Sequence, residues 1–419
     1  MKRKSIRTLQ LLIVALLSLV FLPGLVNAQE KVVKIGAMFP MSGRAGQYGK
    51  DSVAAAQMAV DEINNNGGVA GYKLEFVNTD SKAKPQYAVR IAKRYITQDE
   101  VDFLFGVVSS GVGLAVSEIA HQYKTIFIGT DHASTRLTVD DYQKYYFRVS
   151  NNTFQSMAAG ALYLKELKET KGWETLAFIG PDYAYGHSQW DELKYNLDRF
   201  DVDYKVVGTY WPKLFQPDYT PFITSLMRDN PDVLVSGFWG GDTVAFIKQA
   251  KPYGILERSL YFHPDAGGNY EVMSGLGEEL PTGLVLSARH HNNWPDTELN
   301  REYVRKFHER TGTYPTYAAE GAYAGIKVIA KVVEEVGNPE DTEKLIKALE
   351  NISIKLPEDP EGFTSHMYKP THQMIQVQAI GETVANDDFP PAKRMLGNWK
   401  VYPAEDLVPP EEYIKMKRE

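Results

Sequence analysis

Short apolar runs alternate with longer amphipathic segments along most of the chain. The runs predict β-strands at VVKIGAMF, LEFVNTD, VDFLFGVV, TIFIG, YYFRVS, TLAFIG, YKVVGTY, DVLVSGF, SLYFHP and GLVLSA. Many of the intervening segments have apolar residues three or four positions apart, as on one face of an α-helix. In residues 51–68, Val53, Ala56, Val60 and Ile63 share such a face, and the Asn-Asn-Gly-Gly that follows is a helix stop. Repeated strand–helix units predict a mostly parallel sheet with helices on both faces.

The predicted strands are too many for one sheet of comfortable size, so we expect two α/β domains. The first set of units extends to about Arg148, and the second begins with the predicted helix TFQSMAAGALYLKEL. Two long helices are predicted at 297–310 and 317–336 and a third near 341–350, and we expect them to pack back on the first domain. The tail from about residue 385 is rich in proline and charge, and we expect it to pack on the surface or to be partly disordered.

The first 28 residues differ from the rest of the chain. A basic start is followed by an apolar stretch, and Val26-Asn27-Ala28 puts small or apolar residues before an expected cleavage point. We therefore expect residues 1–28 to be a secretory signal peptide, with a retained membrane anchor as the alternative. The chain has no cysteine, which excludes a lipoprotein signal and a disulfide framework. Without this leader the net charge is near −11, which argues against a nucleic-acid partner.

The stretch GRAGQYGKDS, residues 43–52, resembles a phosphate-binding loop. A P-loop requires G-x-x-x-x-G-K-[ST], but five residues separate Gly43 from Gly49, and Asp51 follows Lys50 where a hydroxyl is needed. We therefore exclude a nucleotide-binding loop. The glycines still allow the backbone to approach a ligand, and Tyr48 lies between a strand and a helix, at the strand end where open α/β sheets bind ligands.

Other strand ends carry polar and aromatic residues. Ser109 and Ser110 precede a helix, where hydroxyls and free N–H groups suit a carboxylate, although either serine could simply cap that helix. In the second half, strand ends carry Tyr185, Trp239 and Asp265. Two such halves facing one another would suit a small ligand with a negative and a positive end.

The sequence resembles the type I periplasmic binding proteins, specifically the Leu/Ile/Val-binding group that serves ABC transporters. The resemblance is carried by residues 34–76, by VDFLFGVVSSGVGLAVSEIA, by TLAFIGPDYAYGHS and by MYKPTHQMIQVQAIG. It implies two Rossmann-like three-layer α/β/α domains joined by three hinge crossovers, near 148–152, 285–291 and 355–365. We expect an N-terminal lobe from 29–149 plus 288–357, a C-terminal lobe from 150–287 plus 358–384, and a tail from 385–419.

The resemblance also implies a set of ligand contacts. Tyr48 aligns with a cleft aromatic residue, Ser110 with a carboxylate-binding serine beside Ser109, Tyr185 with a tyrosine that contacts an ammonium group, and Asp265 with its acidic partner. Trp239 falls beside an aromatic position of the cleft. A further loop, which in the family supplies a backbone amide and a threonine, contains Asp131, His132, Ala133 and Ser134. Ala133 replaces the threonine, which departs from the family pattern, with Ser134 as a one-residue substitute and His132 as a different contact.

Catalytic and metal-binding motifs are not apparent. The segment around Ser109 lacks G-x-S-x-G, and the chain has no H-E-x-x-H motif. The histidines of RHHNNW point to opposite sides of an extended segment, so we expect no metal and no cofactor, although Arg289 or His290 could touch a ligand.

We therefore expect a periplasmic, monomeric binding protein of an ABC importer that takes an amino acid or a related small carboxylate to a permease. The aromatic residues favour an aromatic or branched substrate. The alternatives are a sensing protein for amides, urea-like or aromatic compounds, and an exported hydrolase that uses Ser110 with His132.

Overall fold

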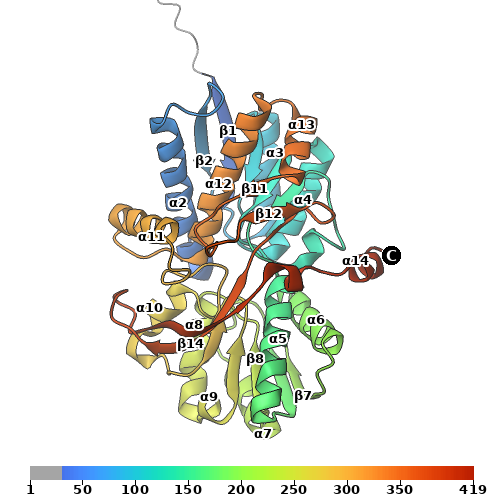
Figure 1. Ribbon diagram of the computed structural model, residues 1–419, viewed down its shortest axis with the longest axis vertical. Coiled ribbons are helices and arrows are strands. Elements are labelled where there is room, and N and C mark those ends of the chain that lie inside the picture. Colours follow the sequence, from blue (N-terminus) through green and yellow to red (C-terminus); the bar gives the residue numbers. More distant parts are fainter. Residues whose placement is uncertain (1–30) are drawn as a thin grey trace, which may run out of the picture. The chain divides into compact units, whose positions relative to one another are not determined.

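Two separate β-sheets organise the part of the chain that the computed structural model describes, Lys31–Glu419 (Figure 1). The expected leader, residues 1–28, lies outside the described residues. The first sheet has eight strands in the order β11-β12-β13-β5-β4-β3-β1-β2, and the second has seven in the order β15-β14-β10-β9-β8-β6-β7. In each sheet a parallel core is extended at one edge by antiparallel strands.

The strand bounds follow the predicted apolar runs. The first sheet contains β1 (Val32–Ala37), β2 (Lys73–Asn78), β3 (Phe103–Phe105), β4 (Ile126–Gly129), β5 (Tyr146–Arg148), β11 (Ser353–Ile354), β12 (Ser365–Tyr368) and β13 (Gln373–Ile375). The second contains β6 (Thr175–Ile179), β7 (Lys205–Tyr210), β8 (Val233–Ser236), β9 (Leu260–His263), β10 (Val285–Ser287), β14 (Gln378–Ala385) and β15 (Arg394–Tyr402). All ten runs predicted from the sequence contain a strand.

The helices predicted with bounds, α2, α3, α4, α5, α11, α12 and α13, are present, and the structure adds others that the sequence does not assign. With the first sheet pack α2 (Gly46–Asn65), α3 (Pro85–Thr97), α4 (Ser110–Tyr123), α11 (Glu298–Thr311), α12 (Tyr317–Val336) and α13 (Thr342–Glu350). With the second pack α5 (Thr153–Lys171), α6 (Ala184–Arg199), α7 (Thr220–Asp229), α8 (Gly241–Ala250), α9 (Ile255–Arg258), α10 (Tyr270–Leu276) and α14 (Glu411–Arg418). The late helices α11, α12 and α13 thus pack with the first sheet. The expected two-domain α/β fold is confirmed.

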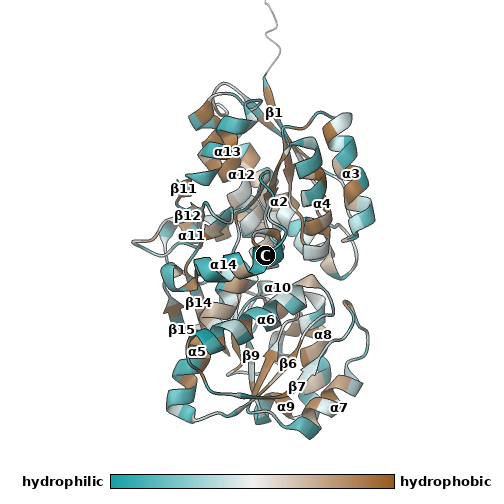
Figure 2. Cartoon of the chain, turned by 90° about the vertical axis from the view of Figure 1, so that its right-hand side faces the viewer, coloured by the Kyte–Doolittle hydropathy of each residue, from teal (hydrophilic) through white to brown (hydrophobic). Residues whose placement is uncertain are grey.

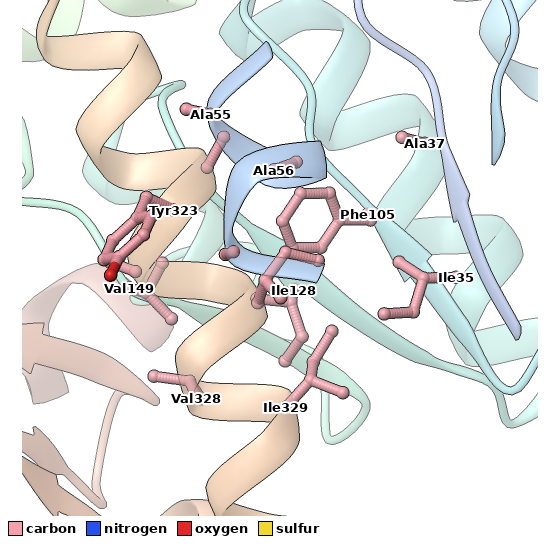
Figure 3. Packing of buried hydrophobic residues seen from close by; sticks show 14 of the residues in the cluster. Ile35, Ala37, Ala55, Ala56, Phe105, Ile128, Val149, Tyr323, Val328 and Ile329 are labelled. Carbon is pink, nitrogen blue, oxygen red and sulfur yellow. The ribbon is translucent and has the colours of Figure 1, made fainter. Parts of the chain in front are cut away.

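Alternation along the strands places a separate hydrophobic core on each face of the first sheet. Phe105 and Ile128 belong to the core beneath α2 and α12, whereas Leu104 and Phe127 belong to the core beneath α3 and α4. Figure 3 shows Phe105 and Ile128 beside α2 and α12, and Figure 1 shows these two helices side by side. In Figure 2 strands such as β1 and β6 are largely brown, whereas helices such as α3 and α13 alternate between hydrophilic and hydrophobic residues. Burial on both faces explains why the strand sequences are nearly continuous apolar runs.

Two parts of the late chain differ from the expected boundaries. The strands β12 and β13 belong to the first sheet, so the third crossover lies between β13 and β14, at Gln376 and Val377, and not at 355–365. Within the expected tail, β15 forms the edge of the second sheet, and Tyr413 of α14 packs against Phe154 and Tyr195. The strands β11 to β13 are two to four residues long, too short for a clear alternating pattern in the sequence.

The stretch GRAGQYGKDS forms the turn into α2. Its glycines allow this turn to pack closely against the preceding backbone of the same chain. A Cβ atom on Gly49 would lie 1.6 Å from the carbonyl oxygen of Pro40. Gly43 has a φ of +72°, a left-handed conformation that favours glycine. The close approach that Gly49 permits is therefore between α2 and the segment that follows β1.

Replacing Gly49 should destabilise the first domain. We expect Gly49→Ala to lower the free energy of unfolding by about 2 kcal/mol or more, because the new methyl group overlaps backbone that cannot move freely. Gly46→Ala, in the same turn, is the control, since its Cβ would lie 3.4 Å from Met41. Urea unfolding followed by circular dichroism measures both. Equal stability of the two variants would contradict this account of Gly49.

A pair of buried carboxyl groups lies near the first and third crossovers. Glu320, in the first turn of α12, interacts with Glu358, and Gln376 at the third crossover donates to Glu358. Gln376 also donates to the carbonyl oxygen of Val149 at the first crossover, 3.4 Å away. Burial raises the pKa of both carboxyl groups, and for Glu358 the neighbouring Glu320 charge raises it further. The pair therefore prefers to hold a proton at pH values where exposed glutamates are ionised.

This pair should make folding stability fall with rising pH. Because the pKa of Glu320 is higher in the folded chain than its ordinary 4.5, its contribution is complete below about pH 4.5 and is lost as the pH rises through the folded value. We expect Glu320→Gln to reduce the fall in Tm between pH 5 and pH 8 by about 2–4 °C. Glu335→Gln, at an exposed position of the same helix, is the control and should leave the slope unchanged. An unaltered slope in Glu320→Gln would show that this carboxyl group does not titrate in that window.

Candidate functional site

A small cavity lies where the strand ends of the two sheets meet. Its volume is about 10 Å³, room for about one water molecule. Its walls come from segments that follow β3, β4, β6, β8 and β10 and from the start of α12. The lining residues are Val108, Ser110, Asp131, His132, Ala133, Tyr183, Tyr185, Trp239, Arg289 and Tyr317. The site thus lies at the carboxyl ends of parallel strands, the ligand-binding edge of open α/β sheets.

Arg289 is the central charged group of this site. Its Nε donates to Asp265 Oδ1 at 3.1 Å, and one terminal nitrogen donates to Asp265 Oδ2 at 2.7 Å. The other terminal nitrogen donates to the side chain and to the carbonyl oxygen of Asp131, at 2.8 and 2.6 Å. Asp131 follows β4 of the first sheet and Asp265 follows β9 of the second, so one guanidinium joins the two domains.

The two aspartates differ in their environments. Burial alone would raise the pKa of Asp265, but Arg289 and hydrogen bonds from Tyr185 and Ser156 outweigh it and hold the pKa below the usual 3.8. Burial raises the pKa of Asp131 to about 7, because Arg289 compensates only in part and the charge of Asp265 opposes ionisation. Asp131 Oδ2 has no hydrogen-bond partner. Arg289 therefore pairs with one fully bonded carboxylate, Asp265, and with one half-bonded carboxyl group, Asp131, and of these two only Asp131 lines the cavity.

Ser110 and the loop after β4 form the other side of the cavity. The Oγ of Ser110 accepts a hydrogen bond from the backbone N–H of Ser134 at 3.1 Å, and the Ser134 hydroxyl pairs with Ser188 of α6 at 2.7 Å. The ring nitrogens of His132 pair with the carbonyl oxygen of Val107 and the hydroxyl of Tyr146, at 3.0 and 2.8 Å. Burial lowers the pKa of His132 to about 3, so this ring is neutral at physiological pH.

Tyr48 is buried behind the cavity, between the two domains. Its hydroxyl accepts from the backbone N–H of Gly240 at 3.1 Å and from Asn269 Nδ2 at 2.9 Å. Its ring meets Trp239 and Tyr317 edge-on, at centroid distances of 5.7 and 5.3 Å. Tyr48 therefore supports two aromatic walls of the cavity without lining it.

The residues predicted from the sequence fall into two groups. Ser110, His132, Ala133, Tyr185 and Trp239 line the cavity. The other four, Tyr48, Ser109, Ser134 and Asp265, do not line it. Ser134 donates to Ser110, and Asp265 accepts from Tyr185. Tyr48 accepts from Gly240, the residue after Trp239.

Four lining residues were not assigned a ligand contact from the sequence: Val108, Asp131, Tyr183 and Tyr317. Arg289 was considered only as a residue that could touch a ligand. Arg289 follows a predicted strand directly, and Asp131 lies two residues after another. This position at a strand end is the feature of the sequence that could have identified both as cavity residues.

The arrangement offers little for nucleophilic catalysis by Ser110. Both ring nitrogens of His132 are occupied by Val107 and Tyr146, and the hydrogen bond that Ser110 accepts comes from the backbone of Ser134. A serine nucleophile requires a base within hydrogen-bond reach, with a third group that orients that base. His132 is instead held as a packing residue, with its ring stacked on Phe127.

Comparison with known sequences identifies relatives over most of the chain. The family described as "Periplasmic binding protein" matches residues 32–387. A leucine-, isoleucine-, valine-, threonine- and alanine-binding protein of Pseudomonas aeruginosa is 25% identical over 331 residues, which cover 79% of this chain and 85% of the relative. A Leu/Ile/Val-binding protein homolog of Brucella melitensis is 23% identical over 416 residues, with 95% of each chain covered. Within Lys31–Glu419, none of the helices has the length and apolar character needed to cross a membrane.

Solved structures share the fold. A periplasmic binding protein from Burkholderia mallei has a TM-score of 0.79 at 21% identity, covering 91% of this chain and 98% of the other. A solute-binding protein of an ABC transporter from Rhodopseudomonas palustris, in complex with 3,4-dihydroxybenzoic acid, has a TM-score of 0.79 at 22% identity, with 90% and 98% covered. The chain belongs to the periplasmic binding protein family, and its fold is the type I fold of the Leu/Ile/Val-binding group.

Proposed function

We propose that this protein is the extracytoplasmic solute-binding component of an ABC importer and captures an amino acid or a related small carboxylate between its two domains. The observation that carries the proposal is the cavity at the meeting of the two sheets. It combines aromatic walls with a few inward polar groups, the combination that small-molecule sites use. Membership of the periplasmic binding protein family supports a periplasmic location and a role in binding rather than catalysis.

Binding of a solute between the two domains requires the domains to separate. A cavity of about 10 Å³ admits no amino acid, so the walls must move before a solute enters. The chain passes between the sheets at three crossovers: 149–152, 288–297 and 376–377. A few residues at such crossovers can absorb the rotation of one domain relative to the other. We propose that the solute binds to an open form and that closure encloses it before delivery to a permease.

The chemical class of the solute is supported by the walls and by the relatives. Aromatic rings of Tyr183, Tyr185, Trp239 and Tyr317 line the cavity, so a branched or aromatic solute would bury more apolar area than a very small one. The N-terminus of α4, with Ser110, supports a solute that bears a carboxylate, because free N–H groups at a helix start favour an anion. Among the relatives, some carry names of amino acid-binding proteins, and others are structures in complex with benzoic acids.

A sensing protein with the same cavity is the second candidate, since solute capture and domain closure serve a receptor as well as a permease. We propose that the protein acts as a monomer, as expected from the sequence.

A thermal-shift screen tests the proposed function directly. We expect the purified protein to gain several degrees in Tm with at least one amino acid, aromatic carboxylate or amide at millimolar concentration, because a ligand that binds only the folded form stabilises it by mass action. Compounds of unrelated chemistry, such as neutral sugars, are the control. A complete absence of shifts across these three classes would count against solute capture in this cavity.

Ser110 should contribute more to binding than its neighbour Ser109. For a carboxylate hit from the screen, we expect Ser110→Ala to raise Kd about tenfold or more, because it removes a hydroxyl donor to a charged group. Ser109→Ala is the matched control, since Ser109 lies one residue earlier and does not line the cavity. Isothermal titration calorimetry measures both. Equal losses in the two variants would place the carboxylate elsewhere.

A further inference from the structure

We propose that Arg289 is a specificity-determining residue, because its ion pair with Asp265 prevents the solute from binding that carboxylate. The N–H donor end of the solute binds Asp131 instead. This inference rests on the proposed function, because it concerns the solute held in the same cavity. The acceptor for an ammonium or amide N–H of the solute is the free Oδ2 of Asp131, whereas the sequence predicts Asp265 for that role.

Asp265 has no capacity left for a solute. Its Oδ1 accepts from Arg289 Nε at 3.1 Å and from the Ser156 hydroxyl at 2.8 Å. Its Oδ2 accepts from Arg289 at 2.7 Å and from the Tyr185 hydroxyl. Four donors therefore occupy its two oxygens, close to the full acceptor capacity of a carboxylate. The residue is fully buried and does not line the cavity.

Displacing Arg289 from Asp265 would be costly. The Arg289 side chain is 4% exposed, so a released guanidinium would have to be rehydrated or left unpaired in the interior. Its central carbon also lies 4.6 Å from the ring centre of Tyr317 and 5.9 Å from that of Tyr185, which adds attraction to these ring faces. A solute ammonium would lose its own hydration to replace contacts that Arg289 already makes.

Asp131 presents the open acceptor. It is 1% exposed and lines the cavity, and its Oδ1 accepts from Arg289 at 2.8 Å whereas its Oδ2 has no partner. A buried carboxyl oxygen without a donor is unfavourable, and a donor supplied by the solute removes that cost. Above the pKa of Asp131, which burial raises to about 7, both aspartates are ionised. They and Arg289 then carry one net negative charge together, which a cationic or N–H donor group complements.

The other nearby cation does not satisfy Asp131. Arg148 is buried behind the loop, and its guanidinium donates to the carbonyl oxygens of His132 and Ser134, to Gln373 and to Thr138. It stabilises the backbone of the loop that carries Asp131. The rings of His132 and His263 are largely neutral near pH 7, because burial lowers their pKa values to about 3 and about 4. The free oxygen of Asp131 thus remains the open carboxyl acceptor facing the cavity.

The test compares matched compounds that differ in one ammonium group. The probes are L-leucine with 4-methylpentanoate and L-phenylalanine with 3-phenylpropanoate, each titrated calorimetrically at pH 8 into the wild-type protein, Asp131→Asn and Asp265→Asn. We expect the N–H member of at least one pair to bind the wild type at least tenfold more tightly. Asp131→Asn, which exchanges an acceptor for a mixed donor and acceptor, should abolish that preference, whereas Asp265→Asn should retain it.

Each result decides the assignment. A preference that survives Asp131→Asn, or that disappears only in Asp265→Asn, overturns it while leaving solute capture intact. If the des-amino acids bind the wild type as tightly as their partners, the assignment is also wrong, and this comparison needs no variant. If Asp265→Asn does not fold, Ser156→Ala removes one donor to Asp265 and should keep the preference. If no probe binds the wild type, solute capture of these classes fails and this inference fails with it.

Discussion

The ion pairs of Arg289 with Asp131 and Asp265 are the interaction on which the arrangement of the two domains depends. Asp131 belongs to the first domain, Asp265 to the second, and Arg289 to the crossover between them. Removing one member of such a buried group leaves an uncompensated charge, which costs roughly 3–5 kcal/mol. The strand ends that bear these residues are therefore held together by groups that cannot be separated singly without a large penalty.

Several weaker contacts also join the two domains. Arg44 at the turn into α2 pairs with Asp242 of α8 at 2.5 Å, and the hydroxyls of Ser134 and Ser188 meet at 2.7 Å. The Tyr48 hydroxyl reaches Gly240 in the second domain. Arg44 is about one-third exposed, so its ion pair is screened by solvent and contributes less than the buried one. These contacts add to the buried ion pairs of Arg289, which supply the charge balance at the centre of the interface.

The sequence predicted the fold better than the site because the two depend on different kinds of information. Strands such as Ile126–Gly129 are buried on both faces, so their apolar character is local and visible. The edge strands near Ser365–Ile375 are short and partly polar, and only their pairing with β5 and with each other defines them. The contact between Arg289 and Asp131 joins residues 158 positions apart, which no local pattern encodes. Ser110, Tyr185 and Trp239 could be predicted as cavity residues, because their position at a strand end was enough to indicate it. The acceptor role expected for Asp265 could not be checked from the sequence. It depended on whether a cationic side chain of the protein itself, here Arg289, pairs with that carboxylate.

For the solute capture proposed above, an internal counter-ion also changes what the solute contributes to closure of the two domains. In a cleft whose carboxylates lacked a partner, closing the domains would bury unpaired charge, and only a cationic solute would make the closed form favourable. Here Arg289 pairs both aspartates without a solute, so the contacts of the closed form are largely satisfied by the chain itself. A solute shifts a conformational equilibrium only by its differential affinity for the two forms. That difference must then come from the few groups left unsatisfied on closure, chiefly the free oxygen of Asp131, together with the aromatic walls. A site built in this way would discriminate solutes by how well they complete one remaining acceptor, and it would respond less to net charge than a cleft with two open carboxylates.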